Sequence, residues 1–229
     1  MASTRRLAAI LAADVAGYSR LMGADESGTL QALKAIRSEL IDPSLAAHNG
    51  RLVKTTGDGL LVEFASVVDA LRCAAEVQAA MAESNAPLPP DRRVEFRVGI
   101  HQGDIVVGDG DIFGDGVNIA ARLEALAEPG GICVSARVQE DAAGKLDLAF
   151  EDLGEQALKN ITRPVRAYSI ATGAVSSTAA VAPDLPLPDK PSIAVLPFAN
   201  LSGDLEQEYF ATAWSRRSSP HSRVSAGCL

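Results

Sequence analysis

Residues 5–17, "RRLAAILAADVAG", decide the fold: two arginines precede seven apolar residues, and the run ends at Asp14. A twin-arginine export signal needs an uncharged run of about 7–15 residues and a small-residue cleavage site. Here the run barely reaches that lower bound, and a membrane span of about 20 residues is out of reach. We therefore interpret residues 5–14 as a buried strand whose carboxyl end presents Asp14 and Gly17.

The composition excludes several classes of protein. The 229 residues are 47% hydrophobic and carry a net charge of −8, so a basic face for nucleic acid is not expected. The three cysteines, Cys73, Cys133 and Cys228, are far apart and form no metal-binding motif. They are typical of reduced thiols, which predicts a cytoplasmic protein without a membrane span.

The chain then alternates helices and strands. The pattern predicts a helix over 25–48, with four apolar residues on one face: Leu30, Leu33, Ile36 and Leu40. Two β-rich runs flank Gly57-Asp58-Gly59, which is a strong hairpin signal. A second helix is expected over 66–84, with four apolar residues in register: Val67, Leu71, Ala74 and Val77.

One or two strands follow in residues 94–109, then a short helix over 115–127 and a strand over 131–135. Residues 147–171 contribute two further β stretches. The order β-α-β-β-α-β with an α/β extension predicts a ferredoxin-like α+β sheet with helices on one face.

Two aspartates stand near glycine: Asp14 ends the first strand three residues before Gly17, and Asp58 lies between Gly57 and Gly59 in the hairpin. In a ferredoxin-like sheet these two strands are neighbours, so the carboxylates can converge. Together with the carbonyl of Val15 they form a hard-oxygen site suited to Mg²⁺ or Mn²⁺. The alternatives are that Asp14 caps a helix and that Asp58 is an ordinary turn residue.

The second constellation is a pair on the helix over 115–127. Asn118 and Arg122 are four residues apart and therefore share one face, where an amide and a guanidinium suit a phosphate or a developing oxyanion. A solvated helix face is the alternative. Lys54 and Lys159, taken singly, are typical of exposed lysines. No phosphate-binding GxxxxGK[ST] motif and no Ser/His/Asp triad is present.

Taken together, five segments in the same order resemble the catalytic domain of the class III nucleotidyl cyclases. These are "ILAADVAGYSRLM", "GRLVKTTGDGLLVEF", "RVGIHQGDIVVGD", "DIFGDGVNIAARLEALAEPGGICVS" and "LKNITRPVRAY". The resemblance covers roughly residues 5–171. It implies an adenylate or guanylate cyclase domain over 1–171.

The resemblance also implies roles for single residues. Asp14 and Asp58 match the aspartates that bind two metal ions, and Asn118 and Arg122 match the transition-state pair. Lys159 matches a lysine that contacts the triphosphate. Backbone amides around Ala16, Gly17 and Tyr18 are expected to bind phosphate oxygens. His101 is interpreted as structural.

Lys54 and Asp111 match the purine-selecting positions, where lysine and aspartate go with adenine. A lysine donates to the ring nitrogen of adenine, and a carboxylate accepts from its amino group. Guanine reverses these roles, and guanylate-specific members typically carry residues such as glutamate and cysteine. The implied reaction converts ATP to cyclic AMP and pyrophosphate, and an enzyme that catalyses it is a phosphorus–oxygen lyase. The alternatives are a guanylate cyclase and a degenerate nucleotide-binding domain.

In the family, two domains share each site, one giving the metal aspartates and the other the purine and transition-state residues. This chain carries both sets, so the resemblance implies a homodimer with two composite sites.

The remaining residues are expected to lie outside the cyclase domain. Residues 172–190 are rich in Ala, Ser and Pro and are interpreted as a linker. Residues 191–211 resemble the start of a TolB-like second domain, here truncated. Residues 212–229 are basic and serine-rich, and we interpret them as an out-of-frame, disordered tail left by a one-base deletion. A genuine disordered tail is the alternative.

Overall fold

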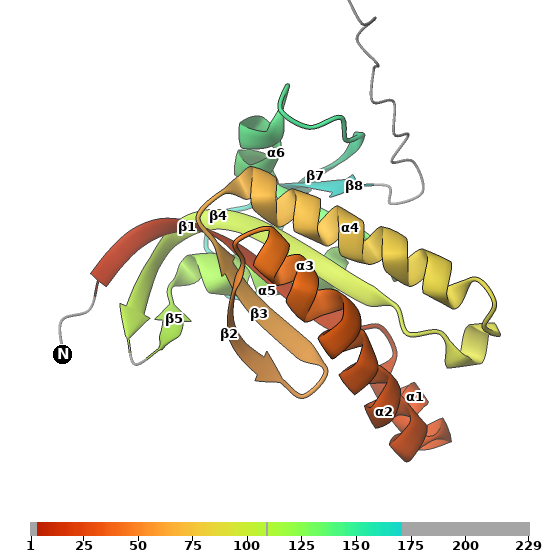
Figure 1. The fold of residues 1–229 in the computed structure, drawn as a ribbon. Coiled ribbons are helices and arrows are strands. Elements are labelled where there is room, and N and C mark those ends of the chain that lie inside the picture. The colour runs from red at the N-terminus through yellow and green to blue at the C-terminus, as the bar shows by residue number, and fades with distance from the viewer. Residues whose placement is uncertain (1–3, 109, 171–229) are drawn as a thin grey trace, which may run out of the picture. The chain divides into compact units, whose positions relative to one another are not determined.

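The computed structural model describes residues 4–108 and 110–170, which form a mixed sheet covered by helices (Figure 1). Within these residues, no helix is both long and apolar enough to cross a bilayer. The expectations for the linker 172–190, the second domain 191–211 and the tail 212–229 lie outside the described residues.

The elements agree with most of the expected order. In chain order they are β1 Thr4–Val15, α1 Tyr18–Ala24, α2 Glu26–Ile36, the π-helical turn η1 Arg37–Ile41, α3 Asp42–Ala47, β2 Arg51–Thr56, β3 Gly59–Phe64, α4 Val67–Asn85, the 3₁₀ turn η2 Pro90–Arg92, β4 Phe96–Gly108, β5 Asp111–Phe113, α5 Asp115–Leu126, β6 Ile132–Ser135, α6 Ala136–Ala142, β7 Phe150–Gln156 and β8 Val165–Ile170. Residues 94–109 yield one long strand, β4, and the short helix α6 was not expected.

The sheet runs in the order β2-β3-β1-β4-β6-β8-β7, with β5 paired to β4. β1 lies between β3 and β4 and is antiparallel to both. The expected neighbourhood of the first strand and the hairpin is therefore confirmed, with Ala13 opposite Leu60. This arrangement confirms an α+β fold of the ferredoxin-like kind.

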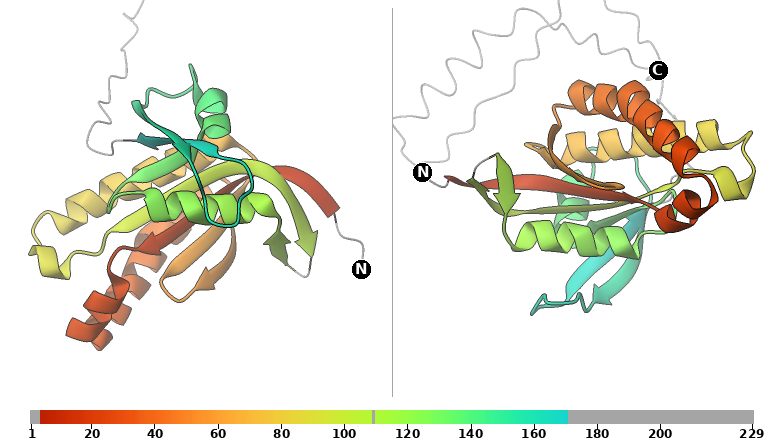
Figure 2. Two further views of the ribbon diagram at one scale, coloured as in Figure 1. Left: turned by 180° about the vertical axis from the view of Figure 1, so that it is seen from behind. Right: turned by 90° about the horizontal axis from the view of Figure 1, so that it is seen from below.

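β1 is buried on both of its faces from Ala8 to Ala13, whereas residues 5–7 are exposed, which shortens the expected buried strand. Ala9, Leu11 and Ala13 belong to the core under α3 and α4, whereas Ile10 and Ala12 pack on the side of α5. The right-hand view of Figure 2 shows α5 on one side of the sheet and the other long helices on the opposite side. The expectation of helices on one face is thus wrong for α5. Burial on both faces explains why the run before Asp14 is continuously apolar rather than alternating.

The expected helix over 25–48 is a succession of α2, η1 and α3, preceded by the separate helix α1. Pro43 explains the π turn, because proline has no N–H to continue the ladder and its ring crowds the carbonyl four residues earlier. The Asp42 N–H accordingly donates to the carbonyl of Arg37, five residues back. Leu33 packs against the core as expected, but Leu30 is exposed, which corrects its assignment.

α5 lies directly against β4 at Gly99. A Cβ atom at this position would be 2.1 Å from the backbone nitrogen of Glu124 and 2.2 Å from the carbonyl oxygen of Ala120. No side chain fits between the strand and the helix here, so glycine sets how closely α5 approaches the sheet. The position of every side chain on α5 depends on this contact.

Gly99→Ala should therefore lower the free energy of unfolding by about 1–3 kcal/mol, the usual cost of overpacking. Gly23→Ala is the matched control, because Gly23 lies in α1 with no atom within 4 Å of an added Cβ. Urea denaturation of the two variants is the measurement. Equal stabilities would contradict the close packing of α5 on β4.

Candidate active site

Asp14 lies at the carboxyl end of β1, where the buried strand reaches the edge of the core. Its side chain is 23% exposed. The alternative that Asp14 caps a helix is excluded, because α1 begins after Gly17 and has no side-chain cap. Asp14 is therefore placed by the strand, and its carboxylate is available for another partner.

That partner is Arg97 on β4, which lies directly opposite Asp14 in the β1–β4 register. Arg97 Nε donates to Asp14 Oδ1 at 2.9 Å, and its Nη2 donates to the other carboxylate oxygen. Nη2 also lies 3.8 Å from Glu124 Oε1 of α5. Sequence reasoning missed both residues, since Arg97 is brought to Asp14 by the strand register and Glu124 by the packing of α5 on β4.

Asp58 lies in the two-residue turn that joins β2 to β3, with Thr56 opposite Gly59. The turn is Gly57-Asp58 rather than Asp58-Gly59, and the φ of 66° at Gly57 explains why glycine comes first. The negative charge of Asp58 helps to raise the pKa of both Arg97 and Glu124. Asp58 is thus close enough to interact electrostatically with the groups around Asp14.

Asp14, Asp58 and Glu124, with Arg97 between them, are called the acidic cluster below. Burial raises the pKa of Glu124 to about 7, and the neighbouring charge of Asp14 adds to the effect. With a pKa of about 7, Glu124 carries only part of a charge at neutral pH, but the carboxylates together still outweigh the single guanidinium. This excess negative charge fits a divalent cation.

The donor set of the acidic cluster fits a metal ion shared with a substrate. Among residues 4–108 and 110–170, no group of three or more His, Cys, Asp or Glu is placed to hold a metal by itself. Mg²⁺ commonly uses only one or two carboxylates and completes its shell with water and phosphate oxygens. Asp14 and Asp58 are the residues that would hold such an ion.

Lys54 and Asp111 form an ion pair, with Lys54 Nζ 2.7 Å from Asp111 Oδ2. Both side chains are partly exposed, and Oδ1 of Asp111 accepts the Ile112 N–H at 2.7 Å. The hydrogen bond from Lys54 lowers the pKa of Asp111, so this carboxylate is a charged acceptor at neutral pH. The two predicted purine-selecting residues are therefore brought together.

Asn118 is exposed on α5, and Arg122 is half-buried one turn further along. Arg122 Nε is buried and has no hydrogen-bond partner within the described part of the chain. Lys159 is exposed in the loop between β7 and β8. Their roles as transition-state and triphosphate residues stay predictions.

The three predicted phosphate-binding amides differ in availability. The Ala16 N–H already donates to the Glu95 carbonyl at 2.8 Å, so in the free chain this amide is paired. Gly17 is the N-cap of α1, and Tyr18 is its first residue. The role of these two amides stays a prediction.

His101 is structural, as interpreted from the sequence. Its Nδ1 lies 2.9 Å from the hydroxyl of the buried Ser135, across from β4 on β6. Burial, together with the nearby positive charge of Arg137, lowers the pKa of His101 to about 4. The ring is therefore neutral at physiological pH.

Because the pKa of His101 is lower in the folded protein than in the unfolded chain, its contribution to stability is present above about pH 6.5 and is lost as pH falls toward 4. Between pH 7 and pH 5, the free energy of unfolding of the wild type should fall about 2 kcal/mol more than that of His101→Asn. Urea titrations at several pH values measure this difference. Parallel curves would show that His101 titrates normally.

The family model described as the adenylate and guanylate cyclase catalytic domain matches residues 2–172. The chain belongs to this family. The match confirms the resemblance read from the five segments, and it covers the whole of the described sheet.

Similar proteins support the same assignment. A protein from Rhizobium meliloti (strain 1021) described as putative adenylate cyclase 3 is 52% identical over 210 residues, covering 90% of this chain and 36% of that protein. An adenylate cyclase from Streptomyces coelicolor is 36% identical over 141 residues, and the match covers 60% of this chain and 34% of that protein. The chain thus spans about a third of the length of these relatives.

The fold of the cyclase domain is also found in solved structures. The crystal structure of an adenylate/guanylate cyclase/hydrolase from Silicibacter pomeroyi is 52% identical, with a TM-score of 0.71. The match covers 74% of this chain and 99% of that one. The cyclase fold expected from the sequence is thereby confirmed.

Proposed function

We propose that this cyclase domain is an adenylate cyclase that converts ATP to 3′,5′-cyclic AMP and pyrophosphate. The observation that carries the proposal is the ion pair of Lys54 and Asp111, at 2.7 Å. It sets an ammonium donor beside a carboxylate acceptor, which is the arrangement that adenine requires. The names of the Rhizobium and Streptomyces relatives agree with this choice. A guanylate cyclase would need donor and acceptor exchanged.

Asp14 and Asp58 are the groups that would hold two Mg²⁺ or Mn²⁺ ions, with the carbonyl of Val15 as a further ligand. When bound, such ions acidify the ribose 3′-hydroxyl and neutralise charge on the pyrophosphate. Arg97 neutralises Asp14 in the free protein and would have to give up that carboxylate when a cation binds. Its second contact, with Glu124, keeps the guanidinium beside the acidic cluster when this happens.

The residues of α5 supply the remaining chemistry. Arg122 would stabilise negative charge that builds up on the α-phosphoryl group, and its buried Nε without a partner supports a role in binding an anion. Asn118, four residues earlier on the same face, would orient the ribose.

Residues outside α5 would bind the phosphates. Lys159 would bind the triphosphate as a point charge. The amides of Gly17 and Tyr18 would contact phosphate oxygens.

The chain carries both halves of this machinery. Lys54 and Asp58 lie in one hairpin, four residues apart, although the family assigns them to opposite halves of a site. This placement supports two-fold homodimers in which each site takes its metal aspartates from one chain and its purine residues from the other. The enzyme would act in the cytoplasm, where ATP is abundant.

Purine selection gives the direct test of the proposed substrate. The purified full chain is incubated with ATP or GTP in the presence of Mn²⁺ or Mg²⁺, and the products are identified by mass. Wild type should make cyclic AMP, and Lys54→Glu combined with Asp111→Cys should raise the GTP-to-ATP activity ratio, because donor and acceptor are exchanged. A double variant whose ratio equals that of wild type, although it is folded, would mean that the purine pocket is misassigned.

The shared site is tested by complementation. Asp58→Asn and Arg122→Ala homodimers should each be nearly inactive, but a mixed dimer rebuilds one intact site. With equal amounts and random exchange, activity should return to roughly a quarter of wild type.

The matched control for complementation is either single variant mixed with a chain carrying both substitutions. These mixed dimers contain no intact site and should stay inactive. Single variants that also stay inactive together, although mixed dimers are shown to form, would disprove the shared site. No cyclic nucleotide from wild type at all would favour a degenerate binding domain.

A further inference from the structure

Two hairpins meet at the proposed purine pocket, and two contacts join them. Lys54 of β2 pairs with Asp111 of β5, and Arg51 Nη1 of β2 donates to the carbonyl of Gly110 at 3.2 Å. Gly110 immediately precedes Asp111. β5 has only three residues and pairs only with β4 within the described sheet. Its buried Ile112 anchors the strand, and the Ile112 N–H holds Oδ1 of Asp111. The contacts from β2 hold the other carboxylate oxygen and the preceding carbonyl, so they complete the orientation of this carboxylate.

Arg51 is itself held by a buried carboxylate. Glu63 of β3 lies directly opposite Arg51 in the hairpin register, and its Oε2 accepts from Arg51 Nε at 3.1 Å. The Glu63 side chain is only 4% exposed, so its charge must be paired. Arg6 of β1 binds the other oxygen, Oε1. Glu63 thus lies between two arginines that approach from its two neighbouring strands.

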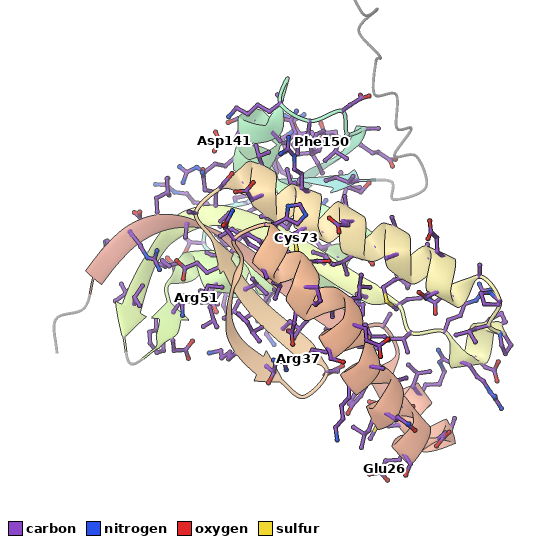
Figure 3. All side chains as sticks on the ribbon, viewed as in Figure 1. Glu26, Arg37, Arg51, Cys73, Asp141 and Phe150 are labelled. Carbon is purple, nitrogen blue, oxygen red and sulfur yellow. The ribbon has the colours of Figure 1, made fainter. Side chains whose placement is uncertain are left out.

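Only one of these two arginines reaches the purine pocket. Arg51 uses Nε and Nη2 for Glu63, which leaves Nη1 for the Gly110 carbonyl. The planar fork of the guanidinium makes the two contacts geometrically dependent on each other. Arg6 makes its ion pair with Glu63 and has no hydrogen bond to the β4–β5 turn within the described residues. Figure 3 labels Arg51 near the end of the sheet where β5 lies.

We propose that Glu63 and Arg51 are positioning residues for purine selection: the buried carboxylate orients Arg51, and Arg51 fixes the Gly110 carbonyl so that Asp111 meets Lys54. This inference rests on the proposed function and adds two residues that do not touch the base. Loss of the Arg51 contact lets Asp111 move, which removes the advantage of ATP over GTP. A displacement of about 1 Å at such a group lowers activity by up to about 100-fold.

Arg51→Gln and Arg6→Gln form a matched pair for the test. Both remove one arginine from the same buried carboxylate, and both arginines are similarly exposed, at 42% and 48%. Both variants should therefore melt at similarly reduced temperatures. Only Arg51→Gln should lower kcat/KM for ATP, by about tenfold or more, while activity with GTP changes little. The GTP-to-ATP ratio should rise in that variant alone.

Arg51→Lys guards against a variant that fails to fold. Lysine keeps an ion pair with Glu63 but cannot reproduce the fork that also reaches Gly110, so stability should be largely retained while the ratio still rises. An unchanged ratio in Arg51→Lys, or an equal rise in Arg6→Gln, would overturn the proposal. With either outcome, the assignment of Lys54 and Asp111 to the purine pocket still holds if Lys54→Glu with Asp111→Cys changes the GTP-to-ATP ratio. If that double variant also has no effect, the assignment and the positioning role both fail.

Discussion

The burial of β1 on both faces is the constraint on which the rest of the structure depends. A strand covered by helices on two sides must be apolar at every position, and Ala8 to Ala13 are all buried. The first residue that can carry a charge is therefore the one at the end of the run, Asp14. The same burial requires a helix on the second face, and α5 fills that place because Gly99 allows close contact. One strand thus sets the positions of both the aspartate proposed to bind metal and the helix that carries Asn118 and Arg122.

Local patterns in the sequence were enough to predict most of the elements and their order. The hairpin around Asp58, the helix α4 and the strand β6 all follow from short-range signals of turn residues and apolar spacing. The failures have physical causes of two kinds. The π turn follows from Pro43, which apolar periodicity ignores. The exposure of Leu30 depends on how the helix meets the sheet, which periodicity does not report. The position of α5 on the second face depends on a layer that the simple ferredoxin-like pattern lacks.

In the candidate site too, some residues could be predicted from local sequence and others could not. The positions of Asp14 and Asp58 were predictable because one ends an apolar run and the other lies between two glycines of a hairpin. Lys54 and Asp111 were singled out through resemblance to the family. Arg97 and Glu124 could not be found in this way, since the contact of Arg97 with Asp14 spans 83 residues. The residue type at position 97 is informative only once the register of β1 against β4 is known. The orphaned Nε of Arg122 likewise becomes visible only when burial is known.

Both halves of the proposed site are neutralised internally in the free chain, but in different ways. Asp14 is paired with Arg97 inside a cluster that has excess negative charge. A cation would therefore have to displace only one arginine from Asp14, and the neighbouring carboxylates would attract the cation. Lys54 and Asp111 are instead a balanced pair at the surface, where an ion pair contributes little to stability and opens at little cost. In the proposed function, a base would therefore insert its own donor and acceptor there without large reorganisation. The acidic cluster would attract a cation through its charge, whereas the surface pair would discriminate between bases through its geometry. A role that depends on geometry is the reason to propose that Arg51 and Glu63 hold the second pair in place.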